Sequence, residues 1–174
     1  LMSESMESML DGIVYAVSPN FFEVYDRFVT DEEALAEMIS NPNAAIVGKL
    51  MADEKGLEIG DILAIKSSSM NSDGTYNWSF QVVGFYTAKQ IKGDEMGAVI
   101  NWDSFDETRI SQKGTIGDVV AKVSDASLAS EIGNIIDERY INSPYATRSG
   151  PESAIAVEMA GEIADIELIV NAIL

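Results

Sequence analysis

The stretch of residues 44–86 constrains the fold of this chain more than any other part. It holds three apolar runs, at residues 45–47, 62–66 and 77–86, and a helix-forming run at residues 49–54 follows the first of them. Short apolar runs bounded by turn residues are typical of β-strands. We therefore expect a β-rich unit in which a strand, a short helix, a second strand and a long third strand follow one another.

Glycines mark the ends of these elements. Gly56 is placed to end the short helix in the left-handed conformation, and Gly60-Asp61 predicts a tight turn into the next strand. The sequence Asn71-Ser-Asp-Gly74 predicts a hairpin loop, because Asp-Gly is a strong turn signal. Strict alternation ends at Val83-Gly84-Phe85, which predicts a β-bulge or a close backbone contact. The glycines are thus interpreted as a folding signature.

The sequence before this stretch predicts one strand and two helices. Residues 12–17 are a β-branched and aromatic run, which is typical of a strand. Ser18-Pro19 has the form of a helix start, and aromatic residues follow at helical spacing as far as Phe28. Thr30-Asp-Glu-Glu33 has the form of a capping box and predicts a second helix through Ile39.

The sequence after this stretch alternates between the two kinds of element. Strands are expected at residues 97–101, 115–123 and 145–148, because these runs are short and rich in β-branched or aromatic residues. Helices are expected at residues 102–107 and 125–140, the second of them with an apolar stripe.

The end of the chain predicts a long helix that allows two interpretations. From Ile155 to Ile173 an apolar stripe follows a near-heptad spacing, and charged residues stop after Glu167. One interpretation is a C-terminal core helix. The other is a helix that leads into a membrane, which needs about 20 apolar residues. At the opposite end, residues 1–10 predict a frayed helix and show no basic region typical of a signal peptide.

The composition excludes several classes of function. The chain carries 29 acidic and 11 basic residues, a net charge of −18, and nucleic-acid binding depends on Lys and Arg that neutralise phosphate. It has no cysteine, which excludes disulfides and thiolate chemistry, and no histidine, which removes the commonest general base and metal ligand. With 174 residues, of which 47% are apolar, the chain is long enough for a substantial core.

Charge is unevenly distributed along the chain. Residues 1–44 carry a net charge of −8, residues 45–114 carry −3 and residues 115–174 carry −7. Two acidic flanks around a nearly balanced middle indicate that the flanks form one unit and that the middle is an insert.

The catalytic and metal-binding templates that we compared with the sequence all fail. Asn71-Ser-Asp-Gly74 begins like a calcium loop but lacks the later ligands and the closing Glu. Asp103, Asp106 and Glu107 could approach one another on a helix, yet a solvated acidic face is the simpler interpretation. Gly48-Lys49 lacks the Ser or Thr that a phosphate-binding loop requires. We therefore expect no enzyme, and we assign no catalytic, cofactor-binding or metal-binding residue.

A series of motifs runs through the chain in a fixed order. It comprises Ala45-Ile-Val-Gly-x-Leu-x-Ala, then Gly56-Leu-x-Ile-Gly-Asp-x-Leu, then Phe80-x-Val-Val-Gly-Phe-Tyr86, and it continues in Val120-x-Lys-Val-Ser-Asp and Asn142-Ser-Pro144. The series resembles the MacB-like periplasmic core domain of ABC transporter permeases of the FtsX, LolC and MacB kind. The resemblance covers most of residues 12–170.

The resemblance implies both an architecture and a function. It implies an α+β fold with a porter-like mixed α/β subdomain, built from residues 1–44 and 115–174, and an inserted β-rich subdomain of residues 45–114. It implies a cell-membrane protein whose domain lies on the periplasmic or extracellular side. There the domain would couple ATP hydrolysis to export, lipoprotein release or control of a partner protein.

The same resemblance implies the partners. These are a second permease copy or a paralogue, a separate ATPase that acts through the membrane domain, and a periplasmic adaptor or substrate protein. We expect no cofactor and no nucleic acid.

Two other functions stay open. One is a standalone extracytoplasmic ligand-binding module, with a cleft lined by the strand at residues 78–86 and the loop at residues 67–75. In that case Trp78, Phe80 and Trp102 would line a pocket, although core packing explains them equally well. The other is an enzyme with a barrel related to the double-psi type, in which Gly-Leu-x-x-Gly-Asp also occurs. The lack of His and Cys argues against the enzyme.

Overall fold

The computed structural model describes residues 13–155 and residue 157. The chain divides into two compact units, Leu1–Val120 and Ala121–Leu174. No helix among the described residues is long and apolar enough to cross a membrane. The helix expected at residues 1–10 and the apolar stripe beyond residue 157 lie outside the described residues.

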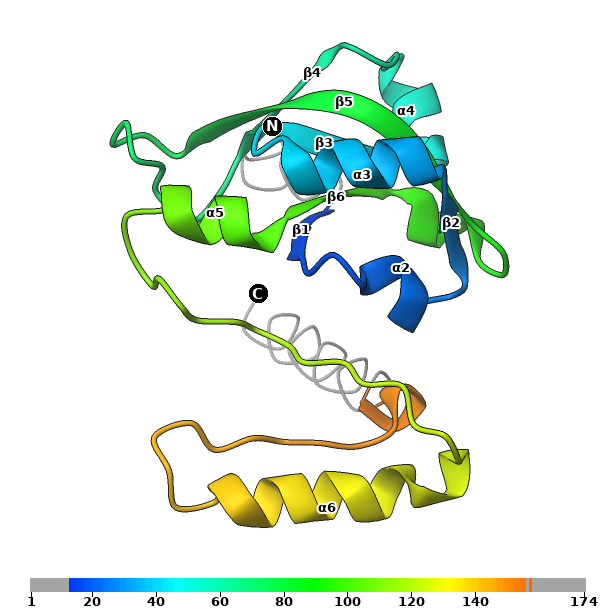
Figure 1. Ribbon diagram of the computed structural model, residues 1–174, viewed down its shortest axis with the longest axis vertical. Helices are drawn as coiled ribbons and strands as arrows, with labels where there is room; N and C mark the ends of the chain where they lie inside the picture. The colour runs from blue at the N-terminus through cyan, green and yellow to red at the C-terminus, as the bar shows by residue number, and fades with distance from the viewer. Residues whose placement is uncertain (1–12, 156, 158–174) are drawn as a thin grey trace, which may run out of the picture. The chain divides into compact units, whose positions relative to one another are not determined.

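A mixed sheet of six strands forms the centre of the first unit (Figure 1). The strands are β1 (Ile13–Val17), β2 (Phe28–Thr30), β3 (Ala44–Gly48), β4 (Ile62–Lys66), β5 (Asn77–Ala88) and β6 (Gly97–Asn101). Their order is β1-β6-β3-β5-β2, and β4 pairs with β5 off this path. β1 is parallel to β6 and β3 is parallel to β5, whereas the other pairs are antiparallel. Together with the helices, this sheet confirms the α+β class.

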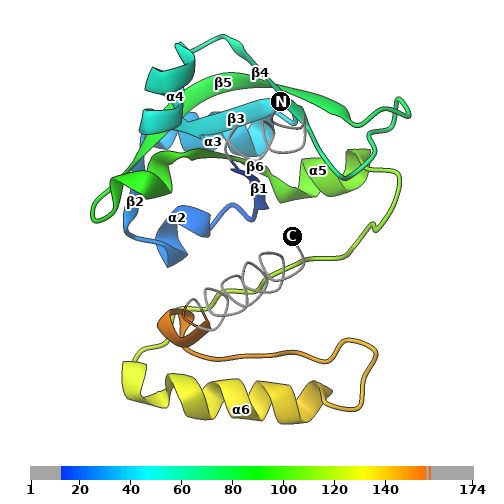
Figure 2. The same cartoon turned by 180° about the vertical axis from the view of Figure 1, so that it is seen from behind.

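The helices that lie wholly within the described residues have at most 12 residues. They are α2 (Phe21–Val24), α3 (Glu32–Ser40), α4 (Lys49–Lys55), the 3₁₀ helix η1 (Lys92–Glu95) and α5 (Trp102–Thr108) in the first unit, and η2 (Ala126–Leu128) and α6 (Ala129–Tyr140) in the second. α3 lies in front of the sheet in Figure 1 and behind it in the opposite view of Figure 2, so it covers one face.

β3 is the central strand of the core, and all five of its residues are buried. Because successive side chains of a strand point to opposite faces, β3 serves two apolar clusters. Val47 belongs to the cluster that contains Met51 of α4, and Ile46 belongs to the cluster that contains Met38 of α3. Burial on both faces explains why this strand is a continuous apolar run in the sequence.

A β-bulge interrupts β5 where the alternation of its sequence ends. Ala45 of β3 pairs with Val82, but the next residue of β3 pairs with Gly84, which leaves Val83 as the extra residue. A Cβ atom added to Gly84 would overlap the Cβ atom of Ala34 on α3. The bulge and the close contact predicted at this point are both confirmed.

The turns predicted between α4 and β4 are also confirmed. Gly56 ends α4 with a φ of 65°. Gly60 has a φ of 98°, and its N–H donates to the carbonyl oxygen of Val82 at 2.8 Å. The carboxylate of Asp61 accepts a hydrogen bond from the backbone N–H of Glu58 at 2.8 Å, so Asp61 is a turn residue.

The helix expected from Ser18 as far as Phe28 is wrong at both ends. α2 has Asn20 as its N-cap residue and extends over four residues only. Phe28 instead begins β2, where it pairs with Ala88 of β5. Its ring stacks on that of Phe21 with 5.7 Å between centroids. The aromatic spacing therefore arises from a tertiary cluster rather than from one helical face.

The next helix forms as predicted, but without the predicted capping box. Asp31 is the N-cap residue of α3 and makes no side-chain cap hydrogen bond. Thr30 ends β2, and its hydroxyl donates to the carbonyl oxygen of Phe85 at 3.0 Å. Thr30 was expected at the start of the helix, but in the structure it belongs to β2 and its strand pairing.

The strands predicted at residues 115–123 and 145–148 do not form in the structure. Both segments are irregular there, and neither joins a β-ladder with a described strand, which a stable strand needs to satisfy its backbone groups. The helix between them is confirmed. The side chain of Asp125 accepts from the N–H of Ser127 at 2.9 Å, and α6 ends at Tyr140, before the expected break.

Gly84 should be intolerant of any side chain. We expect Gly84→Ala to lower the free energy of unfolding by about 1–3 kcal/mol, because the added Cβ overpacks against Ala34. Adding Ala34→Gly removes the overlap but costs about 1 kcal/mol of helix propensity. Urea denaturation of both single variants and the double variant would measure the coupling. Strictly additive losses would contradict the contact.

Gly60 should be intolerant of a β-branched residue for a different reason. Its φ of 98° is strained for any L side chain, although the space around it is open. We expect Gly60→Val to cost about 1–3 kcal/mol of unfolding free energy. Gly117→Val is the matched control, because Gly117 also has open space but no positive φ. Equal melting temperatures for both variants would show that the turn does not require glycine.

Candidate functional site

A groove of about 1060 Å³ lies beside β1 in the first unit. Its walls include β1, the segment from α2 to Phe28 and residues 115–120, and Tyr86 and Val99 also line it. Two β1 side chains on one face of the strand remain open to solvent, Ile13 at 58% and Tyr15 at 54%. The groove therefore combines an end strand of the sheet with exposed apolar surface.

An aromatic cluster forms one wall of this groove. The ring of Phe21 lies 5.1 Å from that of Tyr25, and the ring of Phe28 meets that of Tyr86 edge-on at 5.4 Å. The guanidinium of Arg27 lies over the Tyr25 ring at 4.7 Å, and its Nε is 3.6 Å from the carboxylate of Asp94. Such a cluster is rigid, since each ring is held by its neighbours.

Tyr86 connects the aromatic cluster to η1 through a hydrogen bond. Its buried hydroxyl donates to the backbone carbonyl of Asp94 at 3.0 Å. Burial, followed by the phenol of Tyr15 and the nearby charges of Asp94 and Glu95, raises the pKa of Tyr86 far above its usual range. The hydroxyl therefore stays protonated at physiological pH and serves as a structural donor rather than as a base.

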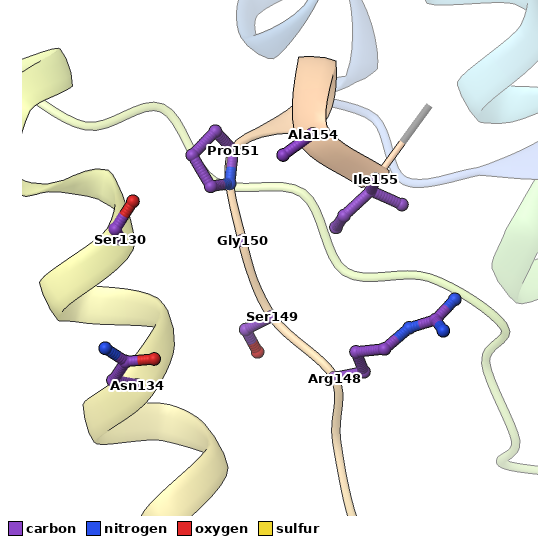
Figure 3. Close-up of a pocket in the computed structure, with 8 residues that line it drawn as sticks. All are labelled: Ser130, Asn134, Arg148, Ser149, Gly150, Pro151, Ala154 and Ile155. Carbon is purple, nitrogen blue, oxygen red and sulfur yellow. The ribbon is translucent and has the colours of Figure 1, made fainter. Parts of the chain in front are cut away.

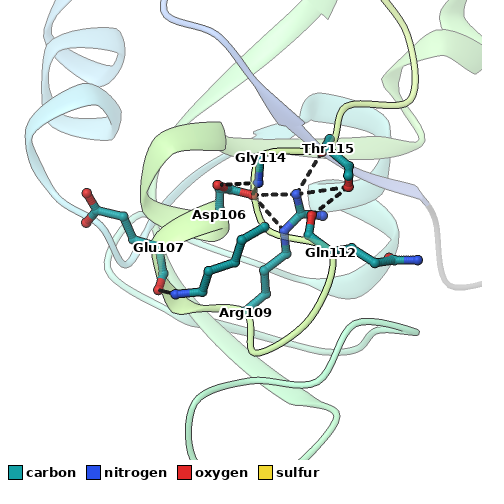
Figure 4. A network of polar contacts seen from close by, with 7 residues as sticks. Asp106, Glu107, Arg109, Gln112, Gly114 and Thr115 are labelled. Atoms are coloured by element: carbon teal, nitrogen blue, oxygen red, sulfur yellow. Dashed lines mark hydrogen bonds and ion pairs between the residues drawn. The ribbon is translucent and has the colours of Figure 1, made fainter. Parts of the chain in front are cut away.

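A polar latch closes the loop after α5 (Figure 4). Arg109 is buried and donates to the carboxylate of Asp106 through Nε at 2.8 Å and through a terminal nitrogen, and the same terminal nitrogen donates to the carbonyl of Thr115 at 2.7 Å. The N–H of Gly114 donates to both oxygens of Asp106 at 2.9 Å. We call Asp106, Arg109, Gly114 and Thr115 the latch. The latch holds Thr115, the first residue of the segment 115–120, in place.

The latch also sets the protonation of its carboxylate. Desolvation alone would raise the pKa of Asp106. The hydrogen bonds from Gly114 and Arg109 and the charges of Arg109 and Lys113 outweigh it and lower the pKa below the usual range. Asp106 is therefore ionised at physiological pH, as its bonds to Arg109 require.

A smaller crevice of about 230 Å³ lies in the second unit, between α6 and the returning chain (Figure 3). The two segments approach closely at Gly133, where an added Cβ atom would lie 3.0 Å from the carbonyl oxygen of Ser149. Asp137 accepts from the N–H of Ser149 at 2.8 Å and from the hydroxyl of Thr147 at 2.7 Å, and these bonds, that of Ser149 first, lower its pKa. The contacts hold the returning chain, and we assign no ligand to the crevice.

The three acidic residues that the sequence placed on one helix have different surroundings in the structure. Asp106 belongs to the latch, whereas Asp103 and Glu107 are exposed. Gly74 has a φ of 82° and its N–H donates to the carbonyl of Asn71 at 2.9 Å, which is hairpin geometry. Among the described residues, no three His, Cys, Asp or Glu side chains are grouped to hold a metal ion.

The three aromatic residues considered for a pocket lie in two different places in the structure. Trp78 and Phe80 are buried in the core with Val82, and the indole N–H of Trp78 donates to the carbonyl of Ser69 at 2.9 Å. Most of the strand at residues 78–86, expected as a cleft wall, is thus part of the core, and Tyr86 at its end lines the groove. Trp102 lines the groove instead.

Sequence reasoning missed the groove and the latch. The groove joins segments that are far apart in the chain, and no local pattern marks it. The latch does have a local signal, because Arg109, the C-cap residue of α5, follows Asp106 by three residues, a spacing at which opposite charges meet.

Comparisons with known proteins agree with the order of the motifs. The family model of MacB-like periplasmic core domains matches residues 3–139. Comparison with curated proteins and with solved structures gave no match.

The latch should make stability depend on pH in a defined direction. Because the folded state lowers the pKa of Asp106, ionisation stabilises the fold above the ordinary Asp value of about 3.9, and this contribution is lost as the pH falls through the lowered value. We therefore expect Asp106→Asn to destabilise the protein at pH 7. The difference from the parent chain should shrink toward pH 3.

Urea denaturation at several pH values measures this difference. Asp103→Asn is the control, since it removes the same charge from an exposed position of the same helix. If the Asp106→Asn difference were constant between pH 7 and pH 3, the latch would not depend on ionised Asp106.

Proposed function

The chain belongs to the family of MacB-like periplasmic core domains, which are extracytoplasmic parts of ABC transporter permeases, and we propose that it transmits force rather than performing chemistry. In this proposal ATP hydrolysis in the cytoplasm moves the membrane helices, and the domain passes the movement to a protein outside the membrane. The observation that carries the proposal is the family match over residues 3–139. This movement would drive export, lipoprotein release or control of a partner protein.

The sheet is suited to such a role. β1 is paired with β6 over five residues, and β2 is paired with β5 over three. A displacement of the first strand would therefore carry the central strands with it, because the ladder must break before β1 can move alone. Force that enters near residue 13 reaches β3 and β5 through hydrogen bonds rather than through a flexible linker.

The division into flanks and insert is part of the proposal. Residues 1–44 and 115–174 would form the porter-like subdomain, and residues 45–114 would form the inserted β-rich subdomain. The charge distribution supports it, since the two flanks are acidic and the middle is nearly balanced. The pairing of β1 and β2 with strands of the middle segment would join the first flank to the insert.

The proposed partners are proteins. A second permease copy or a paralogue would bring a second such domain alongside. A separate ATPase would act through the membrane domain, and an adaptor or substrate protein would bind outside. The net charge of −18 supports protein partners over nucleic acid.

The sidedness of the domain is directly testable in the full-length permease. The chain has no cysteine, so Ser72→Cys places a single thiol in it, on the exposed hairpin loop. With cysteines elsewhere in the permease removed, a membrane-impermeant maleimide should label this thiol in intact cells. Ala52→Cys is the matched control, because Ala52 is buried and its thiol should react only after unfolding. Labelling of position 72 only after permeabilisation would contradict an extracytoplasmic location.

A further inference from the structure

β1 is an end strand whose outer edge is not covered by another strand of the described chain. It pairs with β6 on one side only, and the sheet order begins with it. Native proteins cover or blunt such edges, because unpaired N–H and C=O groups invite pairing with another chain. The β1 edge carries no charged residue to blunt it, since its sequence is Ile-Val-Tyr-Ala-Val.

The chain itself supplies a segment with strand character that lines the same groove as β1. Residues 115–120 line the same groove as all five residues of β1. Their sequence contains Ile116, Val119 and Val120, and β-branched residues favour strands. Val119 is 79% exposed, and Ile116 is 57% exposed. The segment thus has apolar side chains that would gain burial in a sheet.

The latch holds the start of this segment in place. The carbonyl of Thr115 accepts from Arg109, and its hydroxyl donates to the carbonyl of Gln112 at 2.6 Å. Arg109 follows α5, and α5 follows β6, the neighbour of β1. The fixed end is therefore anchored one strand away from the free edge, and the residues after it are not paired.

We propose that residues 115–120 form a strap that adds to the outer edge of β1 as a seventh strand and closes the groove. Pairing satisfies the backbone groups of both segments and covers the exposed side of β1. Release of the strap exposes the edge again. The strap moves about the latch, which stays fixed, because the latch lies at the junction between the fixed loop and the strap.

The strap also gives this part of the chain two mechanical states. Val120 is the last residue of the first unit. When the strap is paired, the chain is held to the sheet up to this boundary; when it is released, the chain is held only as far as Thr115. This inference stands on the groove, the free edge and the latch, and it does not depend on the transporter assignment.

Cysteine scanning tests the strap. With Tyr15→Cys as the anchor, a second cysteine is placed in turn at each of positions 116–120, and disulfide formation is measured under mild oxidation. Disulfides need Cα atoms about 4.4–6.8 Å apart. A paired strand should give one strong position with little cross-linking at its immediate neighbours, whose side chains point to the other face.

Placing the first cysteine at a different position of β1 provides an internal check on the cross-linking pattern. With Ala16→Cys in place of Tyr15→Cys, the strong position should shift by one residue, and the direction of the shift tells parallel from antiparallel pairing. A flat profile, a profile that does not move with the anchor, or no cross-link at any position would overturn the proposal.

Amide hydrogen exchange provides a second test that needs no cysteine. Val119→Pro removes a backbone donor and cannot sit within a paired strand, whereas Val119→Thr keeps a β-branched residue. The amides of β1 that point away from β6 should exchange about tenfold faster or more in the proline variant than in the threonine variant. Equal exchange rates in the two variants would show that the strap does not cover β1.

Discussion

The pairing of β3 with β5 on one edge and β6 on the other is the interaction on which the structure depends. β3 is buried on both faces and contributes to both apolar clusters, as its neighbours β5 and β6 also do. The approach of its neighbours is close, and a Cβ atom at Gly48 would overlap the backbone carbonyl of Glu95. The strand pairs that connect β1 and β2 to the core are attached to β5 and β6 and therefore rely on the same arrangement.

Local signals predicted several strands of the sheet well. The strands at residues 62–66 and 97–101 were predicted to the residue, because each is an apolar run bounded by glycine or polar turn residues. The errors occur where tertiary pairing decides. Phe28 was assigned to a helix because its spacing from Phe21 fits one, and yet it pairs in β2. The strand expected at residues 115–123 has the right sequence but no partner in the structure.

The candidate site was less predictable than the fold. The groove depends on β1, the aromatic cluster and residues 115–120 meeting in space, which no single stretch of sequence encodes. The order of motifs identified the family without indicating a site, because the motifs consist mainly of turn glycines and core residues. Among Asp103, Asp106 and Glu107, the contacts of Asp106 with Arg109 and Gly114 distinguish the structural carboxylate from the solvated ones.

A domain that transmits force must move when ATP is hydrolysed. The direct measurement on the assembled transporter is a spin–spin distance between a label at Lys66→Cys, an exposed position on β4, and a label in the second permease subunit. Force transmission predicts that the distance distribution changes between the ATP-free state and a vanadate-trapped state. An identical distribution in both states would contradict the claim that the domain moves with ATP hydrolysis.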